Sequence, residues 1–247
     1  MGSESLSQTQ KQLKRHGKDT AMNQFQHKID CSPDYAILTV EIPEGETLKV
    51  EASAMASMDT NIKMKTKMKG GFKRLFTGES LFINEFTAEG ASGQIQIAPG
   101  PPGDMRHAGL NGTNTIFLQN SAYVASSPSV ILDTKWQGMM KGFFSGESFF
   151  LIKCSGEGDL FFNSYGGIIE IDVSENYIVD TGCVVAFEET LDYSVRSIGG
   201  MKSLFFSGEG LVCEFKGTGR LWIQTRNVPA LTGWINPFRP TKKSSGD

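Results

Sequence analysis

One short segment occurs three times in this chain, and that repetition constrains the fold more than any other feature. The pattern Phe-Ser/Thr-Gly-Glu-Ser/Gly stands at residues 76–80, 144–148 and 206–210, so that its glycines are 68 and then 62 residues apart. Self-similarity at such a spacing indicates a supersecondary unit that is copied in tandem. The sequence therefore predicts three consecutive units of one kind.

Each copy is flanked by patterns that are typical of β-strands. An apolar run follows each Gly-Glu pair, and a glycine-bearing turn then leads to a second apolar run, at 94–97, 160–162 and 221–223. We interpret each pair of runs as a β-hairpin. Before the first copy, residues 62–69 alternate between Ile, Met or Thr and lysine. A period of two places one set of side chains on the core, here Ile62, Met64, Thr66 and Met68, and the lysines in solvent.

These patterns predict an all-β protein of three tandem β-repeats, and 28 glycines against 9 prolines suit many short strands joined by tight turns. We expect a flexible arm over 1–24 and a flexible tail over 241–247. The repeats are expected at 25–104, 105–174 and 175–240. Trp234, Pro237 and Phe238 are expected to pack the C-terminal segment onto the body.

Composition narrows the classes of function. A formal net charge of −3 gives no overall electrostatic reason to bind a polyanion. No window approaches the roughly 18 consecutive apolar residues of a membrane-spanning helix, so we expect a soluble, cytoplasmic protein without a transmembrane segment. The four cysteines are scattered, form no Cys-x-x-Cys pair, and are expected to be reduced and mostly buried. No cofactor is expected.

The ordered motifs resemble those of the family named for altered inheritance of mitochondria (Aim-type), formerly a domain of unknown function. The resemblance covers about residues 25–240 and rests on the repeated turns, Pro102-Gly103-Asp104, Val179-Asp180-Thr181-Gly182 and Gln224-Thr225-Arg226-Asn227. It implies units similar to the tryptophan RNA-binding attenuation protein (TRAP-like), each a short double-stranded β-helix, placed around a pseudo-threefold axis. It implies no enzymatic activity.

Lysines supply the candidate anion-binding residues. A lysine ladder on one strand face can follow phosphates, and one turn lysine recurs in each copy. The alternative is that ladder lysines protect a sheet edge and turn lysines are solvated. The candidates are Lys63, Lys65, Lys67, Lys69, Lys73, Lys141 and Lys202.

The repeated turns offer a second candidate site. Three glutamates near a common axis could hold a divalent cation, although a structural turn in which glycine meets a backbone requirement is the favoured reading. The residues are Gly78, Glu79, Gly146, Glu147, Gly208 and Glu209. The three histidines fall outside the repeated strands, with His16 and His27 in the N-terminal region and His107 in the linker after the first repeat. We therefore assign no catalytic and no metal-ligating residue.

The expected function is that of a non-catalytic binding or scaffold protein whose surface engages another protein or a second copy of the chain. Two alternatives stay open. One is an anion or nucleic-acid binder that uses the row from Lys63 to Lys69. The other is a ligand or metal binder at the repeated Gly-Glu turns.

Overall fold

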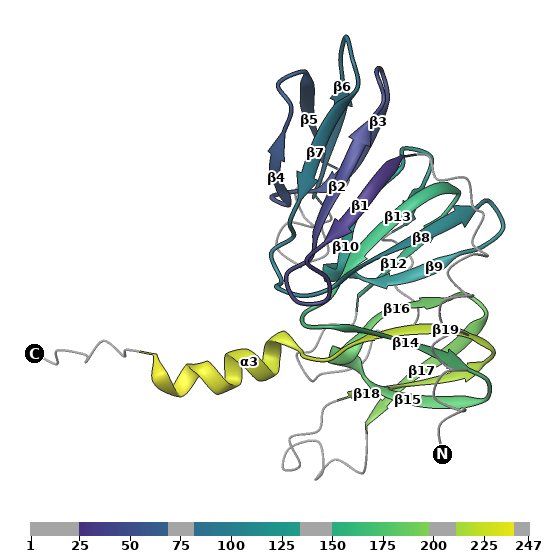
Figure 1. Cartoon of the computed structure of the whole chain (residues 1–247). Helices are drawn as coiled ribbons and strands as arrows, with labels where there is room; N and C mark the ends of the chain where they lie inside the picture. The colour runs from purple at the N-terminus through teal and green to yellow at the C-terminus, as the bar shows by residue number, and fades with distance from the viewer. Residues whose placement is uncertain (1–24, 69–81, 134–149, 198–210, 240–247) are drawn as a thin grey trace, which may run out of the picture.

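The computed structural model describes residues 25–68, 82–133, 150–197 and 211–239 (Figure 1). Within these ranges nearly all regular structure is β-strand, arranged in four sheets, and one short α-helix lies near the C-terminus. The predicted all-β fold is confirmed.

The strands form three units of six, preceded by one additional strand, β1 (Gln26–Asp30). The first unit contains β2 (Ile37–Ile42), β3 (Thr47–Glu51), β4 (Met55–Met58), β5 (Ile62–Met68), β6 (Phe82–Ala88) and β7 (Gly93–Ile97). The second contains β8 (Met105–Asn111), β9 (Ile116–Gln119), β10 (Tyr123–Ser126), β11 (Ile131–Asp133), β12 (Leu151–Ser155) and β13 (Glu157–Asn163). The third contains β14 (Ile168–Val173), β15 (Asn176–Asp180), β16 (Val184–Glu188), β17 (Leu191–Ser197), β18 (Leu211–Gly217) and β19 (Gly219–Gln224). Short 3-10 turns, η2 (Asn120–Ala122) and η3 (Thr181–Cys183), precede β10 and β16.

The strands of the three units pair in one order, always antiparallel. The sixth strand pairs with the first and the third, as β7 does with β2 and β4, β13 with β8 and β10, and β19 with β14 and β16. The fifth strand pairs with the second and the fourth, as β6 does with β3 and β5, β12 with β9 and β11, and β18 with β15 and β17. Each unit therefore consists of two half-sheets of three strands.

Neighbouring units share a sheet. β3 pairs with β10 and β9 pairs with β16, which joins the half-sheets of successive units into two six-stranded sheets. β4 and β15 are instead edge strands of the first and last sheets, toward opposite ends of the molecule (Figure 1). The double-stranded β-helix form of the units and their placement around a threefold axis stay predictions.

The predicted hairpins are wrong. β6 and β7 lie in different sheets, as do β12 and β13, and β18 and β19. β6 is already paired on both sides, with β3 and β5, so the chain turns a corner after it and enters the other half-sheet. Gly90 and Gly156, which follow β6 and β12, and Gly217, the last residue of β18, adopt φ of +76°, +95° and +110°. This left-handed conformation is the one for which glycine was expected in the turns.

Alternating side chains bury three apolar clusters, and each cluster also takes residues from a neighbouring unit. In β2, Leu38, Val40 and Ile42 are fully buried, as a period of two requires. β5 differs from the prediction, because Ile62 is buried whereas Met64 is 50% exposed. Among the described side chains of this strand, the cluster contains Ile62, whereas Met64 and Thr66 are exposed.

Strand pairing also sets the limits of the units. β14 pairs with β19, so residues 168–173 belong with the third unit, whereas the sequence analysis placed them at the end of the second. Alternation identifies a strand but does not identify its partner.

The C-terminal segment projects from the body (Figure 1). Helix α3 (Val228–Ile235) begins after Asn227, whose side-chain oxygen accepts a hydrogen bond from the Ala230 amide, and η4 (Asn236–Phe238) follows it. Trp234 and Phe238 are 67% and 74% exposed, so the expectation that they pack onto the body is wrong. They contact each other instead, with ring centroids 5.8 Å apart. No helix among the described residues is both long and apolar enough to span a membrane.

Candidate functional sites

The predicted lysine row lies on β5. Lys63 and Lys65 are exposed, and Lys67 is in the same strand. Lys65 stands opposite Glu85 of β6, and cross-strand pairs of opposite charge stabilise a sheet. β5 pairs only with β6, and the corresponding strands β11 and β17 are likewise outer strands. The positions of these lysines agree with the protection of a sheet edge.

The remaining predicted site residues lie outside the described residues. They are Lys69, Lys73, Lys141 and Lys202, together with the turn residues Gly78, Glu79, Gly146, Glu147, Gly208 and Glu209.

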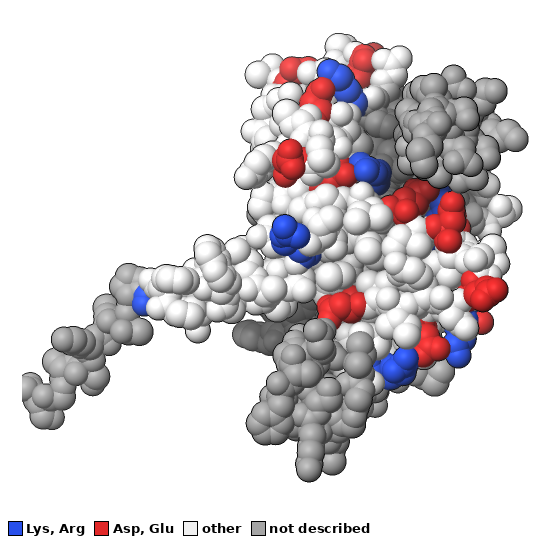
Figure 2. Space-filling model, turned by 60° about the horizontal axis from the view of Figure 1, so that its bottom comes forward, with Lys and Arg blue, Asp and Glu red and all other residues white. Residues whose placement is uncertain are grey.

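Charge is mixed over the surface. Figure 2 shows acidic and basic side chains interspersed on the face that it draws, while the projecting C-terminal segment is uncharged along α3. This distribution accords with the net charge of −3.

Two of the edge strands among the described residues occupy places that are covered by a neighbouring strand in other units, and the first of them is β4. β4, β10 and β16 hold the same place in their units, and each has a bulge at its second residue. The second strand of the preceding unit covers β10 and β16, and all four residues of β10 are buried. Among the described strands β4 pairs with β7 alone, and all four of its residues are exposed.

The second of these edge strands is β15, which holds the place of β3 and β9. Val50 of β3 and Leu118 of β9 occupy equivalent positions, because each pairs with the third residue of the strand that covers it in the following unit. Pairing with the fifth strand of each unit identifies Val179 as the equivalent residue of β15. The residue before Val179 is Ile178, which is 49% exposed, whereas the equivalent residue of β9, Phe117, is 4% exposed.

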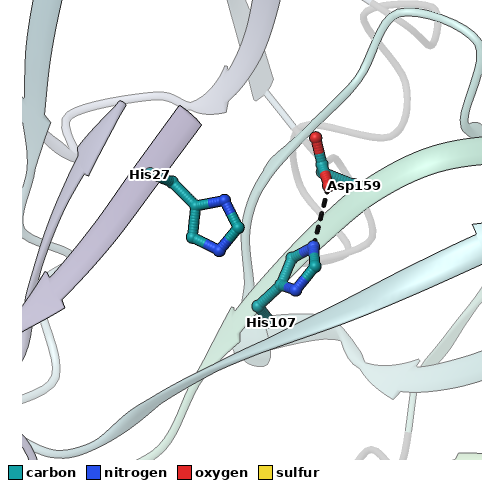
Figure 3. A group of neighbouring side chains, drawn as sticks. All are labelled: His27, His107 and Asp159. Atoms are coloured by element: carbon teal, nitrogen blue, oxygen red, sulfur yellow. Dashed lines mark hydrogen bonds and ion pairs between the residues drawn. The ribbon is translucent and has the colours of Figure 1, made fainter. Parts of the chain in front are cut away.

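Two histidines and an aspartate meet where the first and second units adjoin (Figure 3). His27 lies in β1, His107 in β8 and Asp159 in β13. One donor atom from each lies within 4.8 Å of the others. The sequence analysis placed these histidines in an N-terminal region and a linker, but both are in strands. β1 adds to β2 at the edge of the first sheet, and this brings His27 beside the second unit.

Hydrogen bonds fix the orientation of this group, which we call the histidine cluster. His27 Nδ1 lies 3.1 Å from the carbonyl oxygen of Phe25, and His107 Nε2 lies 2.8 Å from Asp159 Oδ1. Carbonyl and carboxylate oxygens accept hydrogen bonds, so these two nitrogens carry the protons. In the neutral rings the other nitrogens, His27 Nε2 and His107 Nδ1, keep their lone pairs. Asp159 Oδ2 accepts a hydrogen bond from the Phe25 amide.

The surroundings favour neutral imidazole at His27. Burial lowers the pKa of His27, and the nearby charge of His107 lowers it further, against the raising effects of the Phe25 carbonyl and Asp159. The two imidazole rings are 4.4 Å apart between centroids, and each also contacts Phe161. His27 Nε2 therefore offers a lone pair beside the buried carboxyl group of Asp159.

This cluster was not predicted from the sequence, because its members are far apart in the chain. One signal was available. Asp159 precedes the apolar run Leu160-Phe161-Phe162, and a carboxylate at the start of a buried strand needs partners.

Three comparisons relate the chain to known proteins. Residues 27–226 match the family model described as mitochondrial biogenesis AIM24. An uncharacterized protein of Streptococcus pyogenes serotype M6 is 26% identical over 235 residues, which cover 90% of this chain and 94% of that protein. The crystal structure of a Streptococcus pyogenes protein is similar with a TM-score of 0.75 and 24% identity, covering 87% of this chain and all of the other. That structural similarity bears on the fold alone.

Proposed function

The chain belongs to the mitochondrial biogenesis AIM24 family, and within that family we propose that it acts as a non-catalytic scaffold that binds further copies of itself end to end. The contact would add β4 of one copy to β15 of the next. The observation that carries this proposal is the repeated pairing of one unit's second strand with the third strand of the following unit.

The two joints inside the chain supply the register of the proposed contact. Ser126 pairs with Lys49 in one joint, and Phe187 pairs with Phe117 in the other. The corresponding pair between copies is Met58 with Ile178. Phe117 and Phe187 stack with centroids 5.2 Å apart, so side chains at this position meet across a joint.

The composition of the edges supports the same contact. Soluble proteins protect sheet edges with lysine and other charged residues, or with proline. β5, an outer strand, carries lysine at every second position, whereas β4 reads Met-Ala-Ser-Met and has no charge. Met58 and Ile178 are 38% and 49% exposed, and apolar side chains of this size gain from burial.

A contact between different surfaces of identical copies is heterologous. Such contacts form a ring when the rotation between copies closes and a filament when it does not. The proposed assembly would therefore grow beyond a dimer, as a scaffold requires.

The test is Ile178→Lys, examined by sedimentation velocity over a range of concentrations. We expect the unmodified protein to associate reversibly, and the variant to associate at least roughly tenfold more weakly because an unpaired ammonium would be buried at the contact. Ile131→Lys is the matched control. Ile131 is 59% exposed on β11, an outer strand, and its counterpart by strand register in the first unit is Lys63.

A monomeric wild-type protein at all concentrations would contradict the proposal. Equal weakening by Ile131→Lys would contradict the assignment of the contact to β15.

We propose a cytoplasmic location. All four cysteines are free thiols, and burial raises the pKa of Cys213 to about 12, which suits a compartment that keeps thiols reduced. Fractionation of cells that express the tagged chain tests this, and recovery with a membrane or organelle fraction would contradict it.

A further inference from the structure

We propose that His27, His107 and Asp159 bind one divalent transition-metal ion of the zinc class. Each residue contributes one ligand, and the three donor atoms already lie within 4.8 Å of one another. This site is separate from the strand edges of the proposed assembly.

The hydrogen bonds around the histidine cluster match the support that metal ligands receive in proteins. A ligating histidine usually donates its other N–H to a carbonyl or carboxylate, which fixes the ring and its tautomer. His27 does this through Nδ1 to the Phe25 carbonyl, leaving Nε2 as its ligand atom. Asp159 Oδ2 accepts from the Phe25 amide, and this holds Oδ1 toward His107. One residue, Phe25, thus orients two of the three ligands.

The ligand types select the class of ion. Imidazole nitrogen suits zinc, nickel, copper and cobalt, whereas magnesium and calcium prefer oxygen ligands throughout. Two imidazoles and one carboxylate are the protein ligands of known catalytic zinc sites, in which solvent takes the fourth position. The side chain of His107 is 21% exposed, so solvent can reach the cluster although the Asp159 side chain is 1% exposed.

The ion would brace two units against each other. His27 is in β1, which pairs with the first unit, while His107 and Asp159 belong to paired strands of the second unit. Without the ion, ring contacts and the hydrogen bond from the Phe25 amide link β1 to the second unit at this point. A bound ion takes the place of the proton between His107 Nε2 and Asp159 Oδ1. That proton passes through solvent to His107 Nδ1, so the ring stays neutral, and the ion adds ligand bonds across the joint.

The experiment titrates the metal-free full-length chain with Zn²⁺ by calorimetry and with Co²⁺ by visible absorption. We expect one ion per chain, with a Co²⁺ spectrum of nitrogen and oxygen ligands that lacks thiolate charge transfer. His27→Gln should weaken binding at least tenfold, and so should His107→Gln. His27→Gln is the primary variant because His27 is half-buried, and circular dichroism verifies that it folds.

Cys31→Ser is the control, since Cys31 is an exposed thiol that could bind zinc by itself. This variant should bind like the wild type, as should Ile178→Lys, which alters the proposed assembly contact. Absence of stoichiometric binding by the folded wild type overturns the proposal. Unchanged affinity in folded His27→Gln, or loss of binding in Cys31→Ser, does so as well.

Discussion

β4 and β16 occupy the same place in the first and third units, yet their surroundings differ. β16 lies between β19 and β9, and Phe187 in it is fully buried. Within the described part of the chain β4 has only β7 as a neighbouring strand, and Met58, at the position of Phe187, is 38% exposed. The comparison shows that burial at this place depends on the second strand of a preceding unit. An end unit lacks that neighbour, although its edge strand keeps the apolar character of a covered one.

The largest expected effect is a difference in stability between a substitution in β16 and one in β4. Phe187→Ala should lower the free energy of unfolding by about 3–5 kcal/mol, because it leaves a cavity where Phe187 contacts Phe117, Tyr193 and Phe215. Met58→Ala should change it by less than about 0.5 kcal/mol in dilute solution. Urea unfolding of both variants measures the difference. Similar losses would show that β4 is already covered in the monomer.

Met58→Ala also sharpens the comparison at high protein concentration. If a second copy covers β4, the variant should associate more weakly than the wild type there. Unchanged association would show that Met58 is not part of the contact.

A smaller loss of stability is expected from substitutions of the glycines at which the chain passes from one half-sheet to the other. Gly156 has φ of +95°, and a Cβ at this residue would lie 2.5 Å from the Ser129 carbonyl oxygen. Gly90 has φ of +76° with open space around it. Gly90→Ala should therefore cost about 1–2 kcal/mol from backbone strain alone, and Gly156→Ala should cost more. Thermal unfolding compares the two, and equal losses would mean that the close approach to Ser129 relaxes freely.

Much of the fold could be predicted from the sequence because it depends on local patterns. Alternation located the strand β5, and the glycine at 156 was expected in a turn with positive φ. Strand partners could not be predicted, because after a glycine turn the chain can pair with the strand that it has just completed or enter another sheet. The hairpin prediction failed for this reason, and the pairing of β14 with β19 was not foreseen.

The candidate sites divide in the same way. The lysine row was visible as a local pattern, and its place on an outer strand is now explained. The histidine cluster was not visible, because His27 and His107 come together only when β1 adds to the edge of the first sheet. The open edges of β4 and β15 were not visible either, since an edge is defined by the absence of a neighbouring strand.

A further effect is the pH dependence of stability that arises at the covered joint between the first two units. Glu51 of β3 follows Val50, which pairs with Ala125, and burial raises the pKa of Glu51 from 4.5 to about 7. A raised pKa means that the folded chain holds the proton more tightly than the unfolded chain. The contribution of Glu51 to stability is therefore present below pH 4.5 and is lost as the pH rises through about 7.

Glu51→Gln should remove this part of the pH dependence. The wild type should lose stability relative to the variant between pH 5 and pH 8, as measured by urea unfolding at each pH. Parallel pH profiles for the two proteins would show that Glu51 is not the group that titrates.

Disulfide trapping between two chains that each carry one introduced cysteine tests the end-to-end pairing most directly. One chain carries Met58→Cys and the other Ile178→Cys, both in a background with Cys31→Ser, so any link between the new cysteines joins separate copies. The proposed register predicts a covalent heterodimer that forms quickly on mixing under mild oxidation, since side chains of opposed residues on paired strands lie within reach of a disulfide. Met55→Cys mixed with Ile178→Cys is the out-of-register control and should link slowly. Equal rates for the two mixtures, or no heterodimer from the first, would contradict pairing of β4 with β15 between copies.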